Sequence, residues 1–531
     1  MRMVVALSGA VGSGKSTVAE ALVAVVGGER LSTRRMIIDL TGVENERAAL
    51  QEAGDRLDVD TGFSWVADAV GAKWDEADGL LIVDAVRRTE QVEHLRRRFP
   101  GAVRHVHLVA DAEVLAKRHE QRWHNVIELG SYDEVRSHVT EAGVENLAGK
   151  ADVVFDASRL DVRSVAAVAL AGLGLVKTST ARLVDVVVGG QYGSEGKGNV
   201  CSYLAPRYNV LMRVGGPNAG HRVRDPDFDF VHLPSGSLHN RDARLLIGPG
   251  ATLSLPILLD EIERAGVAQR LSIDPQAIII EDGDIAIERA ALDVIGSTKQ
   301  GVGVATARKI LNRGDQPVFG SEVRLARQVS ELQPYVRSTW AELEKAYAAG
   351  ERTMLEGTQG TDLSLHHGAW PHVTSRETTA SGCMADAGIP PSRVDRVVMV
   401  VRTYPIRVGN ASGYSGHMGR EIDAAVVAER SGKDVEVIRT IEVGTRSGKP
   451  RRMAEFDLGQ VRRAAALNGA TEIALTFADY IDAGNEGARS FGQLTEGTRS
   501  FVGMIEDATG CPVRLIASGP HRDDVIEGRE A

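Results

Sequence analysis

A glycine-rich turn between a β-branched run and a helical pattern constrains this chain more than any other feature. The run Val184–Val188 reads as a buried strand interrupted only by Asp185, and five glycines follow it between positions 189 and 198, with Lys197 among them. A strand, a glycine loop and a helix N-terminus in this order point backbone N–H groups at an anion. Glycines also let the anion approach the backbone closely. The stretch therefore predicts a phosphate-binding loop at one edge of an α/β sheet.

This loop is the first of six short motifs in the second part of the chain. It is not a Walker A loop, because five residues rather than four separate Gly190 from Gly196. The motifs read GQYGSEGKGN (190–199), GGPNAGH (215–221), EGTQGT (356–361), VTSRETT (373–379), RTYPIRVG (402–409) and SGP (518–520). In this order they make the chain from about Leu183 to its C-terminus resemble the adenylosuccinate synthetase family.

The resemblance implies a ligase that forms a C–N bond. In this family O6 of a 6-oxopurine nucleotide attacks the γ-phosphoryl group of a nucleoside triphosphate, and the amine of L-aspartate then displaces phosphate from the 6-phosphoryl intermediate. Such chemistry requires removal of the N1 proton, neutralisation of the transferring phosphoryl group and exclusion of water. The resemblance implies Mg²⁺ as cofactor, with the Gly220 carbonyl as a ligand. It assigns catalytic roles to His221, Ser194, Lys197 and Gln359.

The resemblance also assigns residues to each substrate. Purine monophosphate binding is assigned to Asn218, Ala219, Thr298, Thr374 and Arg313. L-Aspartate binding is assigned to Gln300, Thr445, Arg446, Lys449 and Arg451. Triphosphate binding is assigned to Gly193, Glu195, Gly196, Gly198, Asp479, Ser518 and Gly519. The family takes one arginine from a neighbouring subunit; that position aligns with Asn312, with Arg313 beside it as a substitute, so a homodimer is expected.

One departure from the family pattern bears on the purine. Where the family carries GDEGKGK, with the aspartate as general base and metal ligand, this chain has Ser194. A serine hydroxyl is not an unaided base near neutral pH and is a poorer Mg²⁺ ligand than a carboxylate. Its smaller size leaves room for the 2-amino group of guanine, and phage relatives that act on dGMP also carry serine here. We therefore predict (d)GMP rather than IMP as the substrate.

Other interpretations stay open at this point. The chain could be an adenylosuccinate synthetase that acts on IMP with GTP, or a nucleotide-sensing regulatory protein whose sites bind without turnover. The donor is also open: Asp479 can accept from guanine N1 and N2, but Phe477 replaces the family lysine beside it. ATP, dATP and GTP are therefore all candidate donors.

The N-terminus carries a second phosphate loop. The stretch MVVALSGAVGSGKST (3–17) is a buried strand followed by a P-loop pattern, in which the amides hold phosphates, the lysine reaches the γ-phosphate and the serine hydroxyl can ligate Mg²⁺. The residues concerned are Gly9, Gly14, Lys15, Ser16 and Thr17, with Asp84 following a second apolar run at 80–83. Further strands are expected at 103–109 and 152–156, and a helix at 162–173. This part of the chain resembles a nucleoside-monophosphate or dephospho-coenzyme A kinase.

These patterns predict two P-loop-like α/β domains with mainly parallel central sheets flanked by helices. The expected organisation is a kinase-like domain at 1–176, a polar linker at 177–182 and a synthetase-like domain at 183–531. The 531 residues carry a net charge of −10, which argues against a nucleic-acid or anionic-membrane partner. Three cysteines without CxxC spacing and no signal-peptide pattern make the cytoplasm the expected location.

Overall fold

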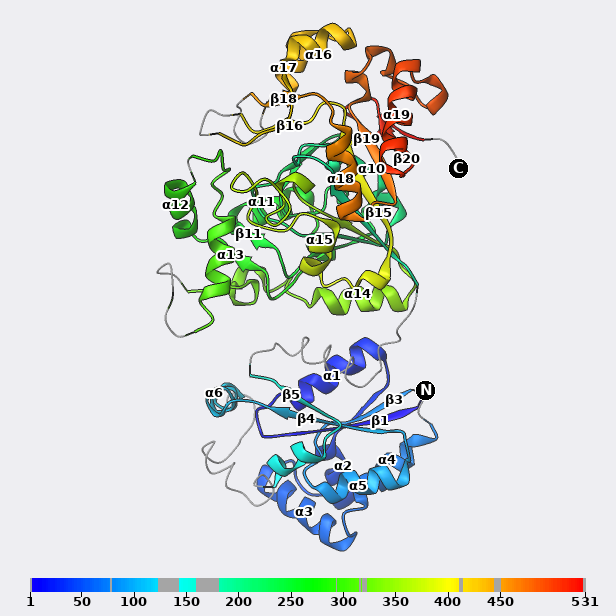
Figure 1. The fold of residues 1–531 in the computed structure, drawn as a ribbon. Helices are drawn as coiled ribbons and strands as arrows, with labels where there is room; N and C mark the ends of the chain where they lie inside the picture. Colours follow the sequence, from blue (N-terminus) through cyan, green and yellow to red (C-terminus); the bar gives the residue numbers. More distant parts are fainter. Residues whose placement is uncertain are drawn as a thin grey trace. The chain divides into compact units, whose positions relative to one another are not determined.

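The computed structural model describes residues 2–76, 79–122, 143–158, 181–292, 294–314, 317, 322–409, 414–443 and 450–528. The chain divides into two compact units, Met1–Thr178 and Ser179–Ala531, and each is described by itself (Figure 1). Residues 177–180 of the expected linker and the helix expected at 162–173 lie outside the described residues. Within the described residues, no helix is long and apolar enough to cross a membrane.

The first unit is built on a five-stranded parallel sheet with the strand order β2-β3-β1-β4-β5. Its strands are β1 (Met3–Gly9), β2 (Glu29–Leu31), β3 (Leu80–Val83), β4 (Val103–Val109) and β5 (Val153–Asp156). Its helices are α1 (Lys15–Val26), α2 (Thr33–Thr41), α3 (Arg47–Asp60), α4 (Trp65–Trp74), α5 (Thr89–Arg98) and α6 (Ala112–Arg122). The apolar runs of the sequence thus become the central strands, as expected for parallel strands covered on both faces.

Strand β1 shows how this unit is packed. Its residues alternate between two cores: Val5 and Leu7 pack with α1 on one face, while Val4 and Ala6 pack with α4 and α5 on the other. The two-residue period of a strand produces this alternation. Figure 1 shows α1 and the pair α4 and α5 on opposite sides of the sheet. The loop that follows β1 therefore lies at the carboxyl edge of the sheet.

The second unit is built on a nine-stranded sheet with the order β12-β10-β7-β14-β6-β15-β19-β20-β21. The strands are β6 (Val184–Gly189), β7 (Val210–Arg213), β10 (Arg244–Ile247), β12 (Leu271–Ile273), β14 (Thr353–Glu356), β15 (Val394–Arg402), β19 (Glu472–Thr476), β20 (Val513–Ala517) and β21 (Val525–Glu527). All pairs are parallel except β20 with β21. This confirms the prediction of mainly parallel central sheets.

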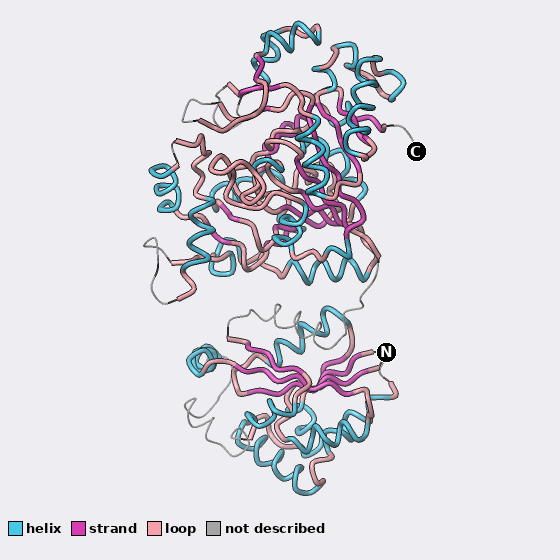
Figure 2. Tube along the Cα trace, in the orientation of Figure 1, coloured by secondary structure: helices cyan, strands magenta, loops and turns pink. Residues whose placement is uncertain are grey.

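Helices cover both faces of this sheet (Figure 2). One face packs against α10 (Lys197–Leu204) and α11 (Leu255–Ala265). The other packs against α14 (Thr339–Ala348), α15 (Ala380–Ala387), α18 (Leu458–Asn468) and α19 (Glu496–Thr509). Strand β6 serves both layers, because Val187 faces the first core and Val186 and Val188 face the second.

Smaller elements are attached around the main sheet. The remaining strands are β8 (His221–Arg224), β9 (Asp227–Phe230), β11 (Thr252–Leu253), β13 (Ile278–Ile279), β16 (Ile406–Arg407), β17 (Glu421–Ile422) and β18 (Arg452–Ala454). The remaining helices are α12 (Asp282–Ala291), α13 (Val302–Leu311), α16 (Ala424–Ser431) and α17 (Val435–Ile441). Strands β8 and β9 form an antiparallel hairpin that begins at His221, the last residue of the GGPNAGH motif.

Candidate active site

The glycine loop after β6 is held in shape by a buried carboxylate. Glu195 Oε1 accepts the backbone N–H groups of Gln191 (3.0 Å) and Gly193 (2.7 Å), and Oε2 accepts Lys197 Nζ at 2.7 Å. The side chains of Glu195 and Lys197 are each 1% exposed. The sequence assigned Glu195 to triphosphate binding. Its carboxylate binds N–H groups of its own loop, so Glu195 acts as a brace that fixes the conformation of this loop.

Two glycines of this loop satisfy conditions that other residues would not. Gly193 and Gly196 have φ values of 92° and 83°, in the left-handed region. A Cβ at Gly193 would also lie 2.8 Å from Cα of Gln359, in the loop after β14. The glycine loop and the EGTQGT loop are therefore in direct contact, which brings Gln359 to the edge of the predicted phosphate site.

His221 is bound into a buried charged network. Its Nδ1 contacts Glu356 Oε1, and the same oxygen accepts Arg213 Nη1 at 3.0 Å and Ser235 Oγ at 2.5 Å. Burial, reinforced by Arg213, lowers the pKa of His221 to about 4. Burial alone would raise the pKa of Glu356, but Arg213 and His221 outweigh it and lower the pKa to about 2. A neutral His221 that donates from Nδ1 to the Glu356 carboxylate directs the lone pair of Nε2 away from the network.

Several polar atoms around these loops are buried and lack a partner among the described residues. Among them are His221 Nε2, Gln359 Nε2 and Asn218 Oδ1. The Nδ2 atom of Asn218 donates to Thr374 Oγ1 at 3.2 Å, and this hydrogen bond joins the GGPNAGH and VTSRETT motifs. Gln359 also has a positive φ of 61°, rare for a residue with a side chain. Buried polar groups are normally satisfied, so this set is what a polar ligand would complete.

Ser194 belongs to the glycine loop but not to the network around His221. Its side chain is half-buried and forms no hydrogen bond with a described residue. Its carbonyl accepts Arg402 Nη1 at 3.2 Å. Arg402 is 1% exposed, and its guanidinium lies 3.9 Å from the centre of the Phe477 ring and binds Glu442 Oε1 at 2.6 Å. Sequence reasoning missed Arg402, Glu442 and the His221 partners, because charged residues are expected at the surface.

Two of the residues expected around the purine monophosphate flank α13: Thr298 lies on the loop before this helix and Arg313 lies beyond it. Thr298 is exposed, and its carbonyl accepts Gln300 Nε2 at 3.1 Å. The loop is held by Glu288, which accepts the backbone N–H groups of Gly301 (2.7 Å) and Gly303 (2.6 Å). Arg313 is exposed just beyond α13, and its Nε donates to the Ile310 carbonyl at 2.7 Å. Glu288 was not predicted, because nothing local in the sequence shows that it faces these glycines.

Only part of the expected aspartate loop is described. Thr445, Arg446 and Lys449 lie outside the described residues. Arg451 follows them; its backbone N–H donates to the Glu442 carbonyl at 3.0 Å, and its guanidinium lies 3.9 Å from the Glu442 carboxylate. Burial lowers the pKa of Arg451. Glu442 thus links this loop to Arg402 and, through it, to the glycine loop.

Outside the glycine loop, the expected donor-binding residues lie after β19 and at the SGP motif after β20. Thr476 Oγ1 donates to the Glu195 carbonyl at 2.6 Å, so the end of β19 rests on the loop. Asp479 is buried, and its Oδ2 accepts Lys433 Nζ at 2.7 Å. Burial raises the pKa of Asp479, and Lys433 opposes this effect. At the SGP motif, Ser518 Oγ donates to the Asp524 carbonyl at 3.2 Å, and a Cβ at Gly519 would collide with Asp524.

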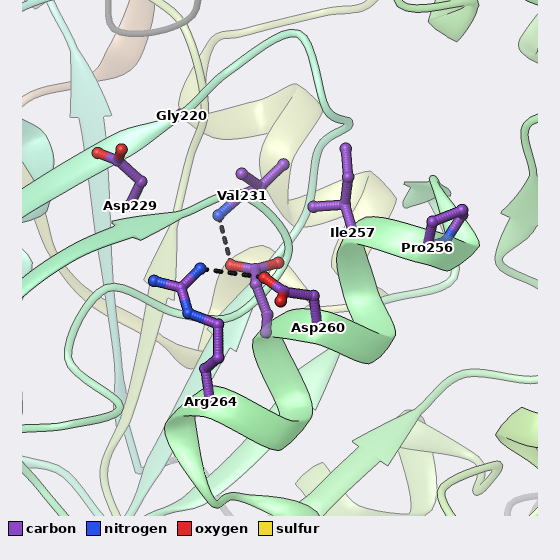
Figure 3. A pocket seen from close by; sticks show the side chains of 8 residues that line it. Gly220, Asp229, Val231, Pro256, Ile257, Asp260 and Arg264 are labelled. Atoms are coloured by element: carbon purple, nitrogen blue, oxygen red, sulfur yellow. Dashed lines mark hydrogen bonds and ion pairs between the residues drawn. The ribbon is translucent and has the colours of Figure 1, made fainter.

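A cavity of about 340 Å³ lies next to the site, between the β8–β9 hairpin and α11 (Figure 3). It is lined by Gly220, Asp229, Val231, Pro256, Ile257, Asp260, Glu261 and Arg264. Burial raises the pKa of Glu261 to about 7, although the N–H groups of Val231 and His232 oppose the shift. Its lining includes three carboxyl side chains against one arginine, so this cavity is a poor match for a phosphate. The anion site is better sought at the glycine loop.

The P-loop of the first unit has the expected form. Gly14 has a φ of 91° and precedes α1, and Lys15 Nζ donates to the carbonyls of Gly9 (2.7 Å) and Ala10 (2.9 Å). Ser16 is half-buried at the start of α1, whereas Thr17 is exposed. The sequence predicted that the Asp84 carboxylate lies at the edge of the sheet where the P-loop would bind a nucleotide.

The Asp84 carboxylate is already engaged. Its Oδ2 accepts Arg30 Nη2 at 2.6 Å, and Oδ1 accepts the backbone N–H of Thr33 at 3.2 Å. A carboxylate neutralised in this way fixes the start of α2. In the described residues, no group of three His, Cys, Asp or Glu side chains could hold a metal ion.

Comparison with known proteins decides the family. The model of the adenylosuccinate synthetase family matches residues 186–317 and 321–486, which is more than half of the chain. The chain belongs to the adenylosuccinate synthetase family. It is 35% identical over 356 residues to the adenylosuccinate synthetase of Thermococcus onnurineus, covering 65% of this chain and 98% of that protein. The enzyme of Methanocaldococcus jannaschii is also 35% identical, covering 65% and 96% of the two chains.

Solved structures of adenylosuccinate synthetase-like proteins agree with this fold. The cyanophage S-2L succinoaminodeoxyadenylate synthetase PurZ, determined bound to dGMP and dATP as an energy donor, is similar with 29% identity and a TM-score of 0.54, covering 66% of this chain and 96% of that chain. The Plasmodium falciparum adenylosuccinate synthetase shares the fold at 21% identity, with a TM-score of 0.56 and coverages of 66% and 100%.

The first unit matches a different family model. Residues 4–153 match an AAA domain, the nucleotide-binding type of fold that the P-loop indicates. The chain therefore combines an adenylosuccinate synthetase-type ligase with a kinase-like P-loop domain. The glycine loop, His221 and Gln359 all lie in the ligase part.

Proposed function

We propose that the synthetase unit joins L-aspartate to C6 of a guanine nucleotide, GMP or dGMP, through a 6-phosphoryl intermediate formed from a nucleoside triphosphate. The observation that carries the proposal is Ser194, a small side chain without a hydrogen bond to a described residue, at the position where the family carries an aspartate. The similarity to a synthetase that was determined with dGMP bound supports the same choice.

The unpartnered buried atoms support a 6-oxopurine as ligand. His221 Nε2 and Gln359 Nε2 flank the glycine loop, and Asn218 Oδ1 lies three residues from His221 along the chain. Leaving a buried polar group without a partner costs about 1–3 kcal/mol, so a ligand that pairs with several of them gains affinity. A purine with an oxygen at C6, a proton at N1 and a phosphate offers both acceptors and donors to such a set.

The size of residue 194 supports guanine over hypoxanthine. Guanine differs from hypoxanthine by an amino group at C2, next to N1. A carboxylate facing N1 would crowd this amino group, whereas the Ser194 hydroxymethyl group is smaller and has no hydrogen bond to a described residue to hold it in place. A site in which no side chain excludes the 2-amino group accepts guanine. Discrimination by a single substituent of this kind is typically about 10- to 200-fold.

The chain's own residues then divide the chemical work. The glycine-loop amides and Lys197 would neutralise the transferring phosphoryl group, and His221, once protonated at Nε2, would donate a hydrogen bond to it while Glu356 fixes the imidazole. Gln359 would orient the purine edge. Mg²⁺ would be held by the Gly220 carbonyl, the Ser194 hydroxyl and nucleotide phosphates, and would supply charge neutralisation when bound. An oxygen donor set with few protein ligands suits a Mg²⁺ ion that arrives with a nucleotide.

The test is an assay of the whole chain with L-aspartate, ATP or GTP, and IMP, GMP or dGMP in turn, with products identified by mass. We expect N6-succino-2-aminopurine product from GMP or dGMP. Ser194→Asp should move the preference toward IMP by about tenfold or more, whereas Ser194→Ala, which keeps the small size, should not. Product from IMP but never from a guanine nucleotide would refute the proposal and establish the IMP-specific activity instead.

A second activity is proposed for the first unit. The P-loop with Lys15 and Ser16 supports an ATP-dependent nucleotide kinase, in which Lys15 would turn from the loop carbonyls to the transferring phosphate and Ser16 would ligate Mg²⁺. Because Arg30 and Thr33 bind the Asp84 carboxylate, it would hold the start of α2 in place rather than ligate the metal ion.

The kinase activity is tested on the full chain with ATP and a panel of nucleoside and deoxynucleoside monophosphates. Lys15→Met should abolish any diphosphate product and leave ligase turnover within about twofold, since the two activities use different loops. Lys73→Met, which removes an exposed lysine of the same unit, is the matched control. If no monophosphate is phosphorylated by the unmodified chain, the kinase proposal is rejected.

A further inference from the structure

The segment after β19 lies directly on the phosphate-binding loop of the synthetase unit. Thr476 Oγ1 donates to the Glu195 carbonyl at 2.6 Å. A Cβ at Gly196 would lie 3.7 Å from the Phe477 ring, which is held by a positive φ of 58° and stacked under the buried Arg402 guanidinium at 3.9 Å. The aromatic ring next to the phosphate loop offers a flat surface for a base. The donor nucleotide bound by this loop would therefore place its base near this segment.

A buried ion pair lies just beyond that ring. Lys433, in the connection between α16 and α17, donates from Nζ to Asp479 Oδ2 at 2.7 Å, and the two side chains are 9% and 8% exposed. Lys433 also contacts Glu486, whose side chain is 57% exposed. Tyr480 contributes to the same group, with its ring centre 5.7 Å from Lys433 Nζ and 5.1 Å from that of Phe477. The pair is thus built into the wall of the donor region.

We propose that Lys433 makes the donor site select adenine over guanine nucleotides, an inference that rests on the proposed ligase function and names its triphosphate. A free carboxylate binds guanine well, because N1–H and the 2-amino group present two parallel donors to its two oxygens. Lys433 already occupies one of these oxygens. The Lys433 ammonium remains as a donor beside the Asp479 carboxylate, which remains as an acceptor. The ammonium matches N1 of adenine, and the carboxylate matches the 6-amino group.

Guanine has a second way to meet this pair, and it is poorer. Its O6 can accept from Lys433 while N1–H donates to Asp479, but the 2-amino group then has no partner at the ion pair. Adenine carries no such group and leaves nothing unpaired. A site that leaves a buried polar group of the wrong base unsatisfied discriminates strongly against it.

The experiment compares ATP, dATP and GTP as donors for the ligase reaction of the full chain. All variants carry Lys15→Met, so that ATP consumption by the first unit does not contribute. We expect kcat/KM to be at least about tenfold higher with ATP or dATP than with GTP, and Lys433→Met to reduce this ratio at least about fivefold by freeing Asp479. Each ratio is measured on one preparation, so a partly unfolded variant does not alter it.

Arg430→Met is the matched control, since Arg430 lies near the end of α16, three residues before Lys433, and forms an ion pair with Glu455. It should leave the ATP to GTP ratio unchanged. A preference for GTP in the parent chain, or an unchanged ratio in the Lys433 variant, overturns the inference. If no acceptor is converted with any donor, the ligase proposal fails. Calorimetric titration with non-hydrolysable ATP and GTP analogues then measures the base preference separately. The Kd of the GTP analogue should be at least about tenfold higher than that of the ATP analogue, and Lys433→Met should reduce this ratio at least about fivefold.

Discussion

At the scale of single residues, His221 shows how burial sets the charge of a side chain. Its imidazole is 6% exposed, and burial outweighs the adjacent Glu356 carboxylate. The result is a neutral ring at physiological pH whose orientation is fixed at Nδ1 and whose Nε2 is left for a ligand. The sequence could place His221 in the site through its motif. It could not show that Glu356, 135 residues later, would hold it, because that contact exists only after β7 and β14 pair.

This environment predicts a pH dependence of stability. The pKa of His221 is about 4 in the folded chain and about 6.5 in an unfolded chain. Between these values the folded state binds fewer protons, so its contribution to the free energy of unfolding is complete above pH 6.5 and is lost as the pH falls toward 4. The expected loss is roughly 3 kcal/mol.

Urea unfolding at pH 7.5, 5.5 and 4.5 measures this effect as the difference between the parent chain and His221→Gln. The variant should lose less stability on acidification, whereas replacement of the exposed His366 should leave the parent profile unchanged. Parallel pH profiles for the parent and the His221 variant would contradict the assignment of a depressed pKa.

At the scale of elements, the strands were predictable and the loops only in part. Buried parallel strands read as continuous apolar runs, and for this reason β4 occupies the whole stretch expected at 103–109 and β3 the run at 80–83. Loops are fixed by contacts between distant segments. The purine-phosphate loop before α13 is an example, because it depends on Glu288 of α12, which accepts the N–H groups of Gly301 and Gly303.

Removing this support should affect substrate binding more than chemistry. Glu288→Gln keeps one carbonyl acceptor and loses the second, so the loop before α13 becomes less well ordered. We expect KM for the purine monophosphate to rise about tenfold with kcat within about twofold, as for an interaction made equally in ground and transition states. Steady-state kinetics tests this, with the exposed Glu263→Gln as control. A fall in kcat without a change in KM would show that Glu288 acts on the reacting groups instead.

At the scale of the whole molecule, Arg313 provides a test of whether two copies of the chain share a site. It is exposed beyond α13, next to Ile310 and Leu311, which are 55% and 52% exposed. We expect a homodimer in which Arg313 of one copy reaches the nucleotide site of the other. A symmetric dimer contains two such composite sites.

Mixing two inactive variants measures this sharing. Arg313→Ala lacks the contributed residue and His221→Ala lacks the residue of the receiving site, so a random heterodimer has one intact site. Subunit exchange should restore about a quarter of the parent activity. A mixture that stays inactive although sedimentation shows exchanged dimers would exclude a shared site, and a monomer by sedimentation would exclude the dimer.

The brace formed by Glu195 has a consequence for the thermodynamics of nucleotide capture. Because the carboxylate ties down two amides and Lys197 before any triphosphate arrives, the loss of chain entropy is already included in folding. In the free protein, before any donor binds, hydrogen exchange at these amides should therefore be slow. The glycine-rich segment, despite its composition, would behave as a rigid receptor.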